Sequence, residues 1–176
     1  MVKWLLVFYQ LDCRLFQGVN RHFDIRGLNL FFSAITHFGG ALFTVGASIL
    51  AMGLTTGELR LTAIASALSL TISHLPVHLI KKWYPRKRPY LSLGSTKFPR
   101  NPLKDHSFPS GHTTAIFSIV IPFILFMPVF LYSLLPMAFG VGLSRVYLGL
   151  HYPTDVLAGG LLGTICGVFC FHLMAV

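Results

Sequence analysis

The sequence predicts an all-α fold: an integral membrane helical bundle with about five transmembrane helices and an N-terminal interfacial amphipathic helix. The first observation is composition, because 54% of the 176 residues are apolar and only 11% are charged, whereas about a quarter of a soluble domain is charged. The second is that long uncharged stretches separate the charged residues. The chain has no Ser/Gly-rich linker, acidic run or internal repeat, so we expect a single membrane-embedded domain over residues 1–176.

Residues 1–27 are the expected interfacial segment. Within it, residues 3–16 carry apolar side chains at helical spacing, namely Trp4, Phe8, Leu11 and Leu15. The charged residues Lys3, Asp12 and Arg14 fall elsewhere around the helix. This pattern is typical of an amphipathic helix that lies on a membrane surface.

The uncharged stretches determine the expected membrane spans, since a spanning helix needs about 20 apolar residues. The stretch from His106 to Ser144 would reach roughly 58 Å as one helix, almost twice the hydrocarbon thickness, so we expect it to turn back near Met127-Pro128. The expected spans are 30–54, 61–80, 110–126, 129–148 and 153 to the C-terminus. In the last span, small residues recur at every fourth position and allow close helix packing. These residues are Gly159, Gly163 and Gly167.

Alternating passes bring three polar segments to one membrane face. These segments are 81–89, 109–112 and 144–155, and together they lie within residues 81–155. The net charge of +9 does not indicate a nucleic-acid partner, because the basic residues cluster beside apolar spans. That placement fits phosphate or anionic lipid head groups better.

The three segments resemble the motifs of the type 2 phosphatidic acid phosphatase superfamily, which shares its site with vanadium haloperoxidases. The family motifs are Lys-x6-Arg-Pro, Pro-Ser-Gly-His and Ser-Arg-x5-His-x3-Asp. The matches are, in order, Lys81 with Arg88-Pro89, then Pro109 to His112, then Ser144-Arg145 with His151 and Asp155. Each motif alone is weak, but their order and spacing together are specific. Many family members have six spans, whereas here a surface helix takes the place of the first.

The residue types suit phosphoryl transfer, in which negative charge spreads over the equatorial oxygens and catalysis depends on positioning and electrostatics. Lys81, Arg88 and Arg145 are the expected phosphate-binding cations. Ser110, as an N-cap followed by Gly111, directs free N–H groups and the positive end of a helix dipole at the anion. These groups make a metal unnecessary, and we expect no cofactor.

The resemblance implies catalytic roles for His151, His112 and Asp155. His151 would attack phosphorus with a neutral imidazole, while Asp155 would hold the other ring N–H and stabilise the imidazolium. His112 would protonate the leaving oxygen and later activate the water that cleaves the phosphohistidine.

Several other polar residues have plainer interpretations. Six cations are expected to be juxtamembrane anchors that contact anionic lipid. They are Lys82, Arg86, Lys87, Lys97, Arg100 and Lys104. His74 and His78 lie one turn apart, but Pro76 disturbs that turn and no third ligand is nearby in sequence, which disfavours a metal site. Asp105 and His106 are interpreted as loop capping residues, with some prospect of contacting substrate.

The leading hypothesis is a lipid phosphate phosphatase, with undecaprenyl diphosphate, phosphatidylglycerophosphate or phosphatidic acid as candidate substrates. The alternative is a small channel or carrier that binds lipid phosphate without chemistry, and a soluble haloperoxidase is disfavoured by the uncharged spans. The expected location is a multi-pass position in the cell membrane, in contact with membrane lipids. The sequence leaves open the lipid tail, the choice between monophosphate and diphosphate, and the oligomeric state.

The orientation of the site is also open. All but one of the 14 Lys and Arg residues fall on the side of the motifs, the exception being Arg60. The positive-inside rule therefore favours a cytoplasmic site, whereas the resemblance favours an outward-facing one.

Overall fold

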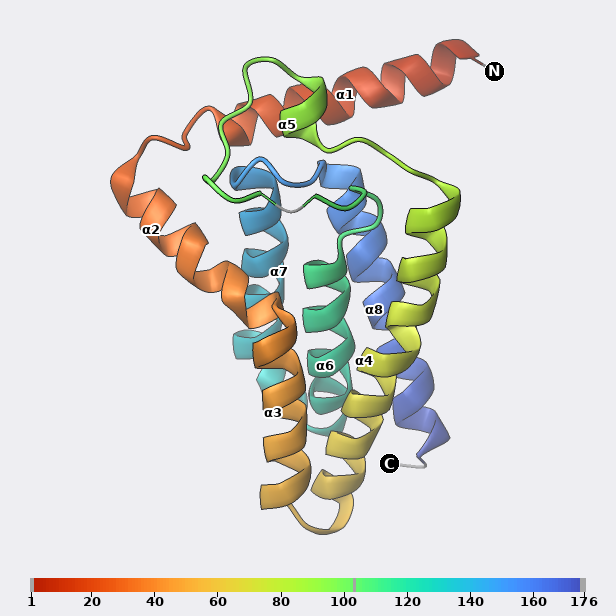
Figure 1. Cartoon of the computed structure of the whole chain (residues 1–176). Coiled ribbons are helices and arrows are strands. Elements are labelled where there is room, and N and C mark those ends of the chain that lie inside the picture. Colours follow the sequence, from red (N-terminus) through yellow and green to blue (C-terminus); the bar gives the residue numbers. More distant parts are fainter. Residues whose placement is uncertain (1, 103, 175–176) are drawn as a thin grey trace.

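The structure is a computed structural model that describes residues 2–102 and 104–174. Across these residues all regular secondary structure is helical (Figure 1), which confirms the all-α prediction. The elements are α1 (Val2–Asn20), α2 (Arg26–Ile35), η1 (Thr36–Gly39), α3 (Ala41–Leu54), α4 (Gly57–Trp83), α5 (Pro89–Ser92), α6 (Gly111–Phe126), η2 (Pro128–Phe130), α7 (Leu131–Tyr147) and α8 (Pro153–Leu173).

Helix α6 lies at the centre of the bundle and packs against α8, α4 and α7. Every residue from Thr113 to Val120 is buried. Its apolar side chains form one cluster with Leu70 of α4 and Val141 of α7. Helix α6 begins at the end of the bundle where the three polar segments lie (Figure 1). The packing of α6 therefore also determines where its first residues lie relative to those segments.

The first predicted span, Leu30–Leu54, is not one continuous helix. Helices α2 and α3 are bent by 52° across η1. A Cβ atom at Gly39 would lie 2.7 Å from the carbonyl oxygen of His112 and 2.7 Å from Val141 Cγ1. The glycine pair at positions 39 and 40 therefore allows the chain to turn where it meets α6, and glycine pairs are a known cause of sharp helix kinks.

Three helical segments are long and apolar enough to cross a membrane, or four if α2 and α3 form one bent span. The three are Gly57–Trp83, Pro128–Tyr147 and Pro153–Leu173. The turn predicted near Met127-Pro128 is confirmed, because α6 ends at Phe126 and η2 begins at Pro128. Helix α6 is apolar but has only 16 residues, so five crossings stay a prediction.

Helix α1 lies across the end of the bundle (Figure 1) and extends beyond the predicted residues 3–16. Its apolar residues Trp4, Phe8, Leu11 and Leu15 are exposed, and its position on a membrane surface stays a prediction. The sequence places Asp12 away from the apolar side of this helix. In the structure, however, Asp12 and Phe16 are both buried against the rest of the chain.

The glycine stripe of α8 packs directly on α6, as the sequence predicts. A Cβ atom at Gly159 would lie 2.6 Å from the Ser110 carbonyl oxygen, and one at Gly163 would lie 2.5 Å from the Thr114 carbonyl oxygen. A Cβ atom at either position would overlap a backbone oxygen of α6. The two glycines therefore allow α8 to lie close to the start of α6.

Candidate active site

The end of α7 explains the spacing between Arg145 and His151. Gly149 has φ +74°, a left-handed conformation that glycine adopts without strain. The N–H of Gly149 donates to the carbonyl of Val146 (3.0 Å), and the N–H of Leu150 donates to the carbonyl of Arg145 (3.1 Å). This is the Schellman arrangement that ends a helix. The N–H of His151 also donates to the Arg145 carbonyl (3.1 Å), which holds the two motif residues in a fixed relation.

His151 is buried, with 1% of its surface exposed. Its Nδ1 lies 2.7 Å from the carbonyl oxygen of Ser107, and since a carbonyl only accepts, Nδ1 carries the proton. Its Nε2 therefore has the lone pair, which accepts from Arg88 Nη1 at 3.0 Å. Burial lowers the pKa of His151 to about 4; the neighbouring Asp155 opposes this shift and Arg88 reinforces it. The imidazole is thus neutral near pH 7, with Nε2 as the potential nucleophile.

Asp155, the predicted partner of His151, lies in contact with it. Asp155 Oδ2 is 3.6 Å from His151 Nδ1, an ion-pair contact, and the Ser107 carbonyl is a second and nearer acceptor. Asp155 Oδ2 also accepts from the Ser107 hydroxyl and, at 2.8 Å, from the backbone N–H of Tyr152. Because α8 begins at Pro153, His151 lies just ahead of the helix and Asp155 lies in its first turn.

Arg86 is not a juxtamembrane anchor, contrary to the prediction. Its Nη1 donates to Asp155 Oδ1 at 2.6 Å, and its Nη2 donates to Asp12 Oδ2 at 2.7 Å. The guanidinium also lies 4.0 Å from the centre of the Tyr152 ring. These two carboxylates outweigh burial and raise the pKa of Arg86. Asp12 in turn accepts from the N–H and hydroxyl of Thr154, at 3.0 and 2.6 Å.

These contacts connect α1 to the site through one buried ionic network. Asp12 from α1, Arg86 from the first motif and Asp155 from the third lie in contact. Two features of the sequence could have indicated this network. Arg86 lies inside the first motif, and Asp12 is an isolated acid on a largely apolar helix.

Lys81 and Arg88 converge, as predicted, but both are paired with Asp105. The Lys81 ammonium contacts Asp105 Oδ2, and Arg88 Nη2 donates to Asp105 Oδ1 at 2.6 Å. Burial raises the pKa of Asp105, but the ion pairs with Lys81 and Arg88 outweigh it and lower that pKa to about 2. Asp105 is therefore more than a loop capping residue, because its carboxylate forms ion pairs with two cations that the sequence predicts to bind phosphate.

Arg145 is buried, with 3% of its surface exposed. Its Nη1 donates to Thr36 Oγ1 at 2.7 Å, while Nε and Nη2 have no hydrogen-bond partner among the described residues. Arg145 also interacts electrostatically with Arg88, with His112 and with the carboxylate of Asp105, although no hydrogen bond joins it to Asp105. A buried guanidinium with unpaired donors beside another cation is unfavourable unless an anion joins it.

The start of α6 differs in one respect from the prediction. Ser110 is the N-cap, but its side chain does not cap the helix; its hydroxyl accepts from Thr113 Oγ1 at 2.9 Å. The N–H of Ser110 donates to the Asp155 carbonyl at 3.0 Å. The backbone N–H groups of Gly111 and His112 have no acceptor within the described residues, so this helix end can still bind an anion.

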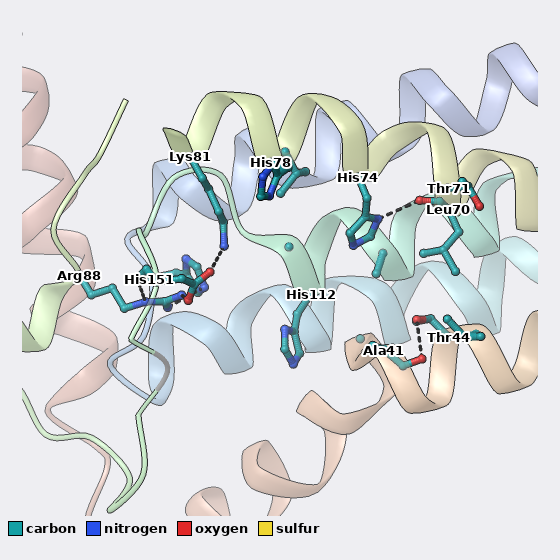
Figure 2. A pocket seen from close by; sticks show the side chains of 16 residues that line it. Ala41, Thr44, Leu70, Thr71, His74, His78, Lys81, Arg88, His112 and His151 are labelled. Atoms are coloured by element: carbon teal, nitrogen blue, oxygen red, sulfur yellow. Dashed lines mark hydrogen bonds and ion pairs between the residues drawn. The ribbon is translucent and has the colours of Figure 1, made fainter. Parts of the chain in front are cut away.

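A cavity of about 660 Å³ joins several of these residues. Its lining includes Lys81, Arg88, Gly111, His112 and His151. Figure 2 shows Lys81, Arg88 and His151 close together, with His112 between them and Ala41. Among residues 2–102 and 104–174, no group of three or more His, Cys, Asp or Glu residues is arranged to hold a metal ion.

Comparison with known proteins places this site in a family. The profile described as the PAP2 superfamily matches residues 62–176. The bacitracin transport permease protein BcrC of Bacillus licheniformis is 33% identical over 116 residues, which cover 66% of this chain and 57% of that protein. The putative undecaprenyl-diphosphatase YbjG of Escherichia coli K12 is 39% identical over 104 residues, covering 58% of this chain and 50% of that protein.

A solved structure supports the same conclusion for the fold. The crystal structure of Aquifex aeolicus LpxE matches with a TM-score of 0.82 and 26% sequence identity, covering 92% of this chain and 95% of that chain. The chain spans about half the length of the curated relatives it matches. Together with the apolar helices, these matches identify a multi-pass membrane protein.

Proposed function

Because the chain belongs to the PAP2 superfamily, we propose that it hydrolyses a lipid phosphate or diphosphate, without a metal, through a phosphohistidine at His151. The observation that carries this proposal is Arg145, whose buried guanidinium has two unpaired nitrogens. A phosphate dianion is an anion of the right charge and geometry to accept from them. Arg88 and Lys81 would bind the same phosphate after Asp105 releases them.

In the first step, the lone pair of His151 Nε2 attacks phosphorus and forms an N–P bond. The P–O bond to the lipid breaks, its electron pair stays on the leaving oxygen, and that oxygen takes a proton from His112. Arg88 Nη1 donates to His151 Nε2, so this donor would transfer to a phosphate oxygen when His151 attacks phosphorus.

In the second step, water attacks the same phosphorus and gives its proton to His112. The N–P bond breaks, and its electron pair returns to Nε2 of His151. One water is consumed for each inorganic phosphate released, and both histidines regain their starting protonation. The Ser107 carbonyl, which holds Nδ1–H, and Asp155, 3.6 Å from Nδ1, would stabilise the positive charge on the phosphorylated ring.

The test is phosphate release by detergent-purified protein, with chelator present, from undecaprenyl diphosphate, phosphatidylglycerophosphate and phosphatidic acid. We expect release by the parent chain and by His172→Ala, a control at an exposed position of α8, and none by His151→Ala. His112→Gln should release phosphate far more slowly than the parent chain, because it removes both the proton donor for the leaving oxygen and the base that activates water. A folded parent chain that releases no phosphate from any of these lipids would contradict the proposal.

One observation supports the carrier hypothesis, namely that the Bacillus licheniformis relative is named a bacitracin transport permease protein. A carrier needs the phosphate-binding cations but not a nucleophile. Binding and movement of a lipid phosphate that are unchanged in His151→Ala, without phosphate release, would favour it over the phosphatase.

A further inference from the structure

Arg86 connects to both acceptors that lie near Nδ1 of His151, although it is not a fixed position of any of the three motifs. Its carbonyl oxygen accepts from the N–H of Ser107 at 2.9 Å, and the Ser107 carbonyl oxygen lies 2.7 Å from Nδ1. Its Nη1 donates to Asp155 Oδ1 at 2.6 Å, and Asp155 Oδ2 lies 3.6 Å from Nδ1. Arg86 therefore reaches the proposed nucleophile along two paths, each through one other residue.

The side chain of Arg86 is held in turn by α1. Its Nη2 donates to Asp12 Oδ2 at 2.7 Å, and the side chains of Arg86 and Asp12 are 15% and 3% exposed. The donors of a guanidinium form a rigid fork, which can bind two carboxylates in a fixed relation. Here one branch binds Asp155, which is buried, and the other binds Asp12. The position of Arg86 thus depends on an acid from α1, a helix outside the residues 62–176 that match the family profile.

Arg86 and Asp12 are separate from the expected phosphate position. The described residues that line the cavity of about 660 Å³ beside His151 include neither of them. Both instead line a different cavity, of about 470 Å³, together with Phe108 and Thr154. An effect of Arg86 or Asp12 on the reaction must therefore pass through the groups that contact His151, rather than through the substrate.

The charges around His151 determine what Arg86 does electrostatically. Burial lowers the pKa of His151 to about 4, and Asp155 opposes that shift. Arg88 and Arg145 reinforce the shift. Further titratable side chains on the cavity wall are His74, His78, Lys81, Asp105 and His112. Because Arg86 is bonded to Asp155, its positive charge offsets part of the negative charge that Asp155 presents to the imidazole.

We propose that Arg86 and Asp12 are positioning residues for the nucleophile of this site. This inference rests on the proposed function, in which His151 attacks phosphorus. Arg86 keeps the two acceptors of Nδ1–H in place, so that the ring keeps one tautomer and one orientation. Asp12 keeps Arg86 between the two acids. Helix α1 thereby contributes to the chemistry, in addition to any contact with the membrane surface.

The first experiment uses two variants that break the same ion pair and remove charges of opposite sign, Arg86→Gln and Asp12→Asn. The measurement is the pKa of His151, from NMR titration of ring-¹⁵N-labelled histidine in detergent, with the His151 signal identified by its loss in His151→Ala. Arg86→Gln should raise this pKa by about one pH unit, because Asp155 then presents its full charge. Asp12→Asn should not raise it, because the charge that it removes is negative.

A purely structural role predicts a different result. Loss of the ion pair would then admit water to the site in both variants, and hydration would raise the pKa of His151 in both, because burial is the main cause that lowers it. The control is Lys87→Gln, which removes the same charge from the exposed neighbour of Arg86 and should leave the value unchanged. An equal rise in Arg86→Gln and Asp12→Asn, or no rise in Arg86→Gln, would overturn the positioning role.

Steady-state kinetics provide the second measurement, with whichever of the three candidate lipids the parent chain hydrolyses and at a temperature below the thermal midpoint of every variant. Arg86→Gln should lower kcat roughly tenfold or more and leave KM within about threefold, because Arg86 is not among the described residues that line the phosphate cavity. Asp12→Asn should lower kcat by a smaller factor, about threefold. Asp24→Asn, at the exposed pair with Lys97, should not change it.

A conservative variant distinguishes the charge of Arg86 from its geometry. Arg86→Lys keeps the charge but not the fork, so it should keep the pKa of His151 near that of the parent chain and recover part of kcat. An unchanged kcat in Arg86→Gln, or a loss confined to KM, would overturn the proposal. If the parent chain releases no phosphate from any lipid, the proposed function fails instead, and the NMR titration still tests the effect of Arg86 on His151.

Discussion

Replacing the buried acid of α1 tests the ionic network behind the site. In Asp12→Asn, one carboxylate oxygen becomes an NH₂ group that faces donors, because Asp12 accepts from Arg86 Nη2 at 2.7 Å and from Thr154 N and Oγ1 at 3.0 and 2.6 Å. The Asp12 side chain is 3% exposed and that of Arg86 15%. Removing one partner of a buried pair costs about 3–5 kcal/mol, and we expect the lower end because asparagine keeps the shape.

The assay is the thermal midpoint of the detergent-purified protein. In a chain of this size, about 3 kcal/mol corresponds to a fall of roughly 6–12 °C. The matched control is Asp24→Asn, because Asp24 pairs with Lys97 at the surface, where the side chains are 72% and 43% exposed. Exposed pairs contribute about 0–1 kcal/mol, so the control should change the midpoint by at most a few degrees. Equal shifts in the two variants would refute the reasoning.

Three further predictions follow from the same structure. Asp105→Asn should lower KM roughly tenfold, about 1.4 kcal/mol, because the phosphate no longer displaces a carboxylate from its two cations; an unchanged or higher KM in steady-state assays would contradict this. The acid limb of kcat/KM, corrected for ionisation of the substrate phosphate, should lie near the His151 pKa of about 4, well below the ordinary value of about 6.5. The unfolded chain binds this proton below pH 6.5 and the folded chain only below about 4, so the contribution of His151 to stability is present above 6.5 and is lost between 6.5 and 4. Gly163→Ala places a Cβ 2.5 Å from the Thr114 carbonyl oxygen and should destabilise by about 1–3 kcal/mol, whereas Gly46→Ala, with no atom within 4 Å, should leave the melting midpoint unchanged or raise it.

Some features were predictable because they depend on local pattern. The helical class follows from long uncharged stretches, and the turn at Met127-Pro128 follows from the length of the stretch that contains it. The close packing of α8 follows from glycines at every fourth position, of which Gly163 is the tightest. The grouping of the motifs follows from alternating helix passes, which bring Arg88 of the first motif and His151 of the third to one end of the bundle, 3.0 Å apart.

Other features depend on which segments, distant in sequence, lie in contact in the folded chain. The sequence suggested Asp155 as the partner of His151 because of their spacing, yet the Ser107 carbonyl lies nearer, at 2.7 Å. Arg86 resembles its basic neighbours in sequence, and only its contacts with Asp12 and Asp155 distinguish it.

Composition, order and spacing along the chain are enough to identify the family, the helical membrane class and the residues of the three motifs. The pairing of those residues becomes visible in the folded chain, where Asp105 contacts Lys81 and Arg88, Arg86 lies between two acids, and Arg145 has unpaired donors. An ion pair depends on the distance between separate segments and on their burial, and local spacing encodes neither quantity.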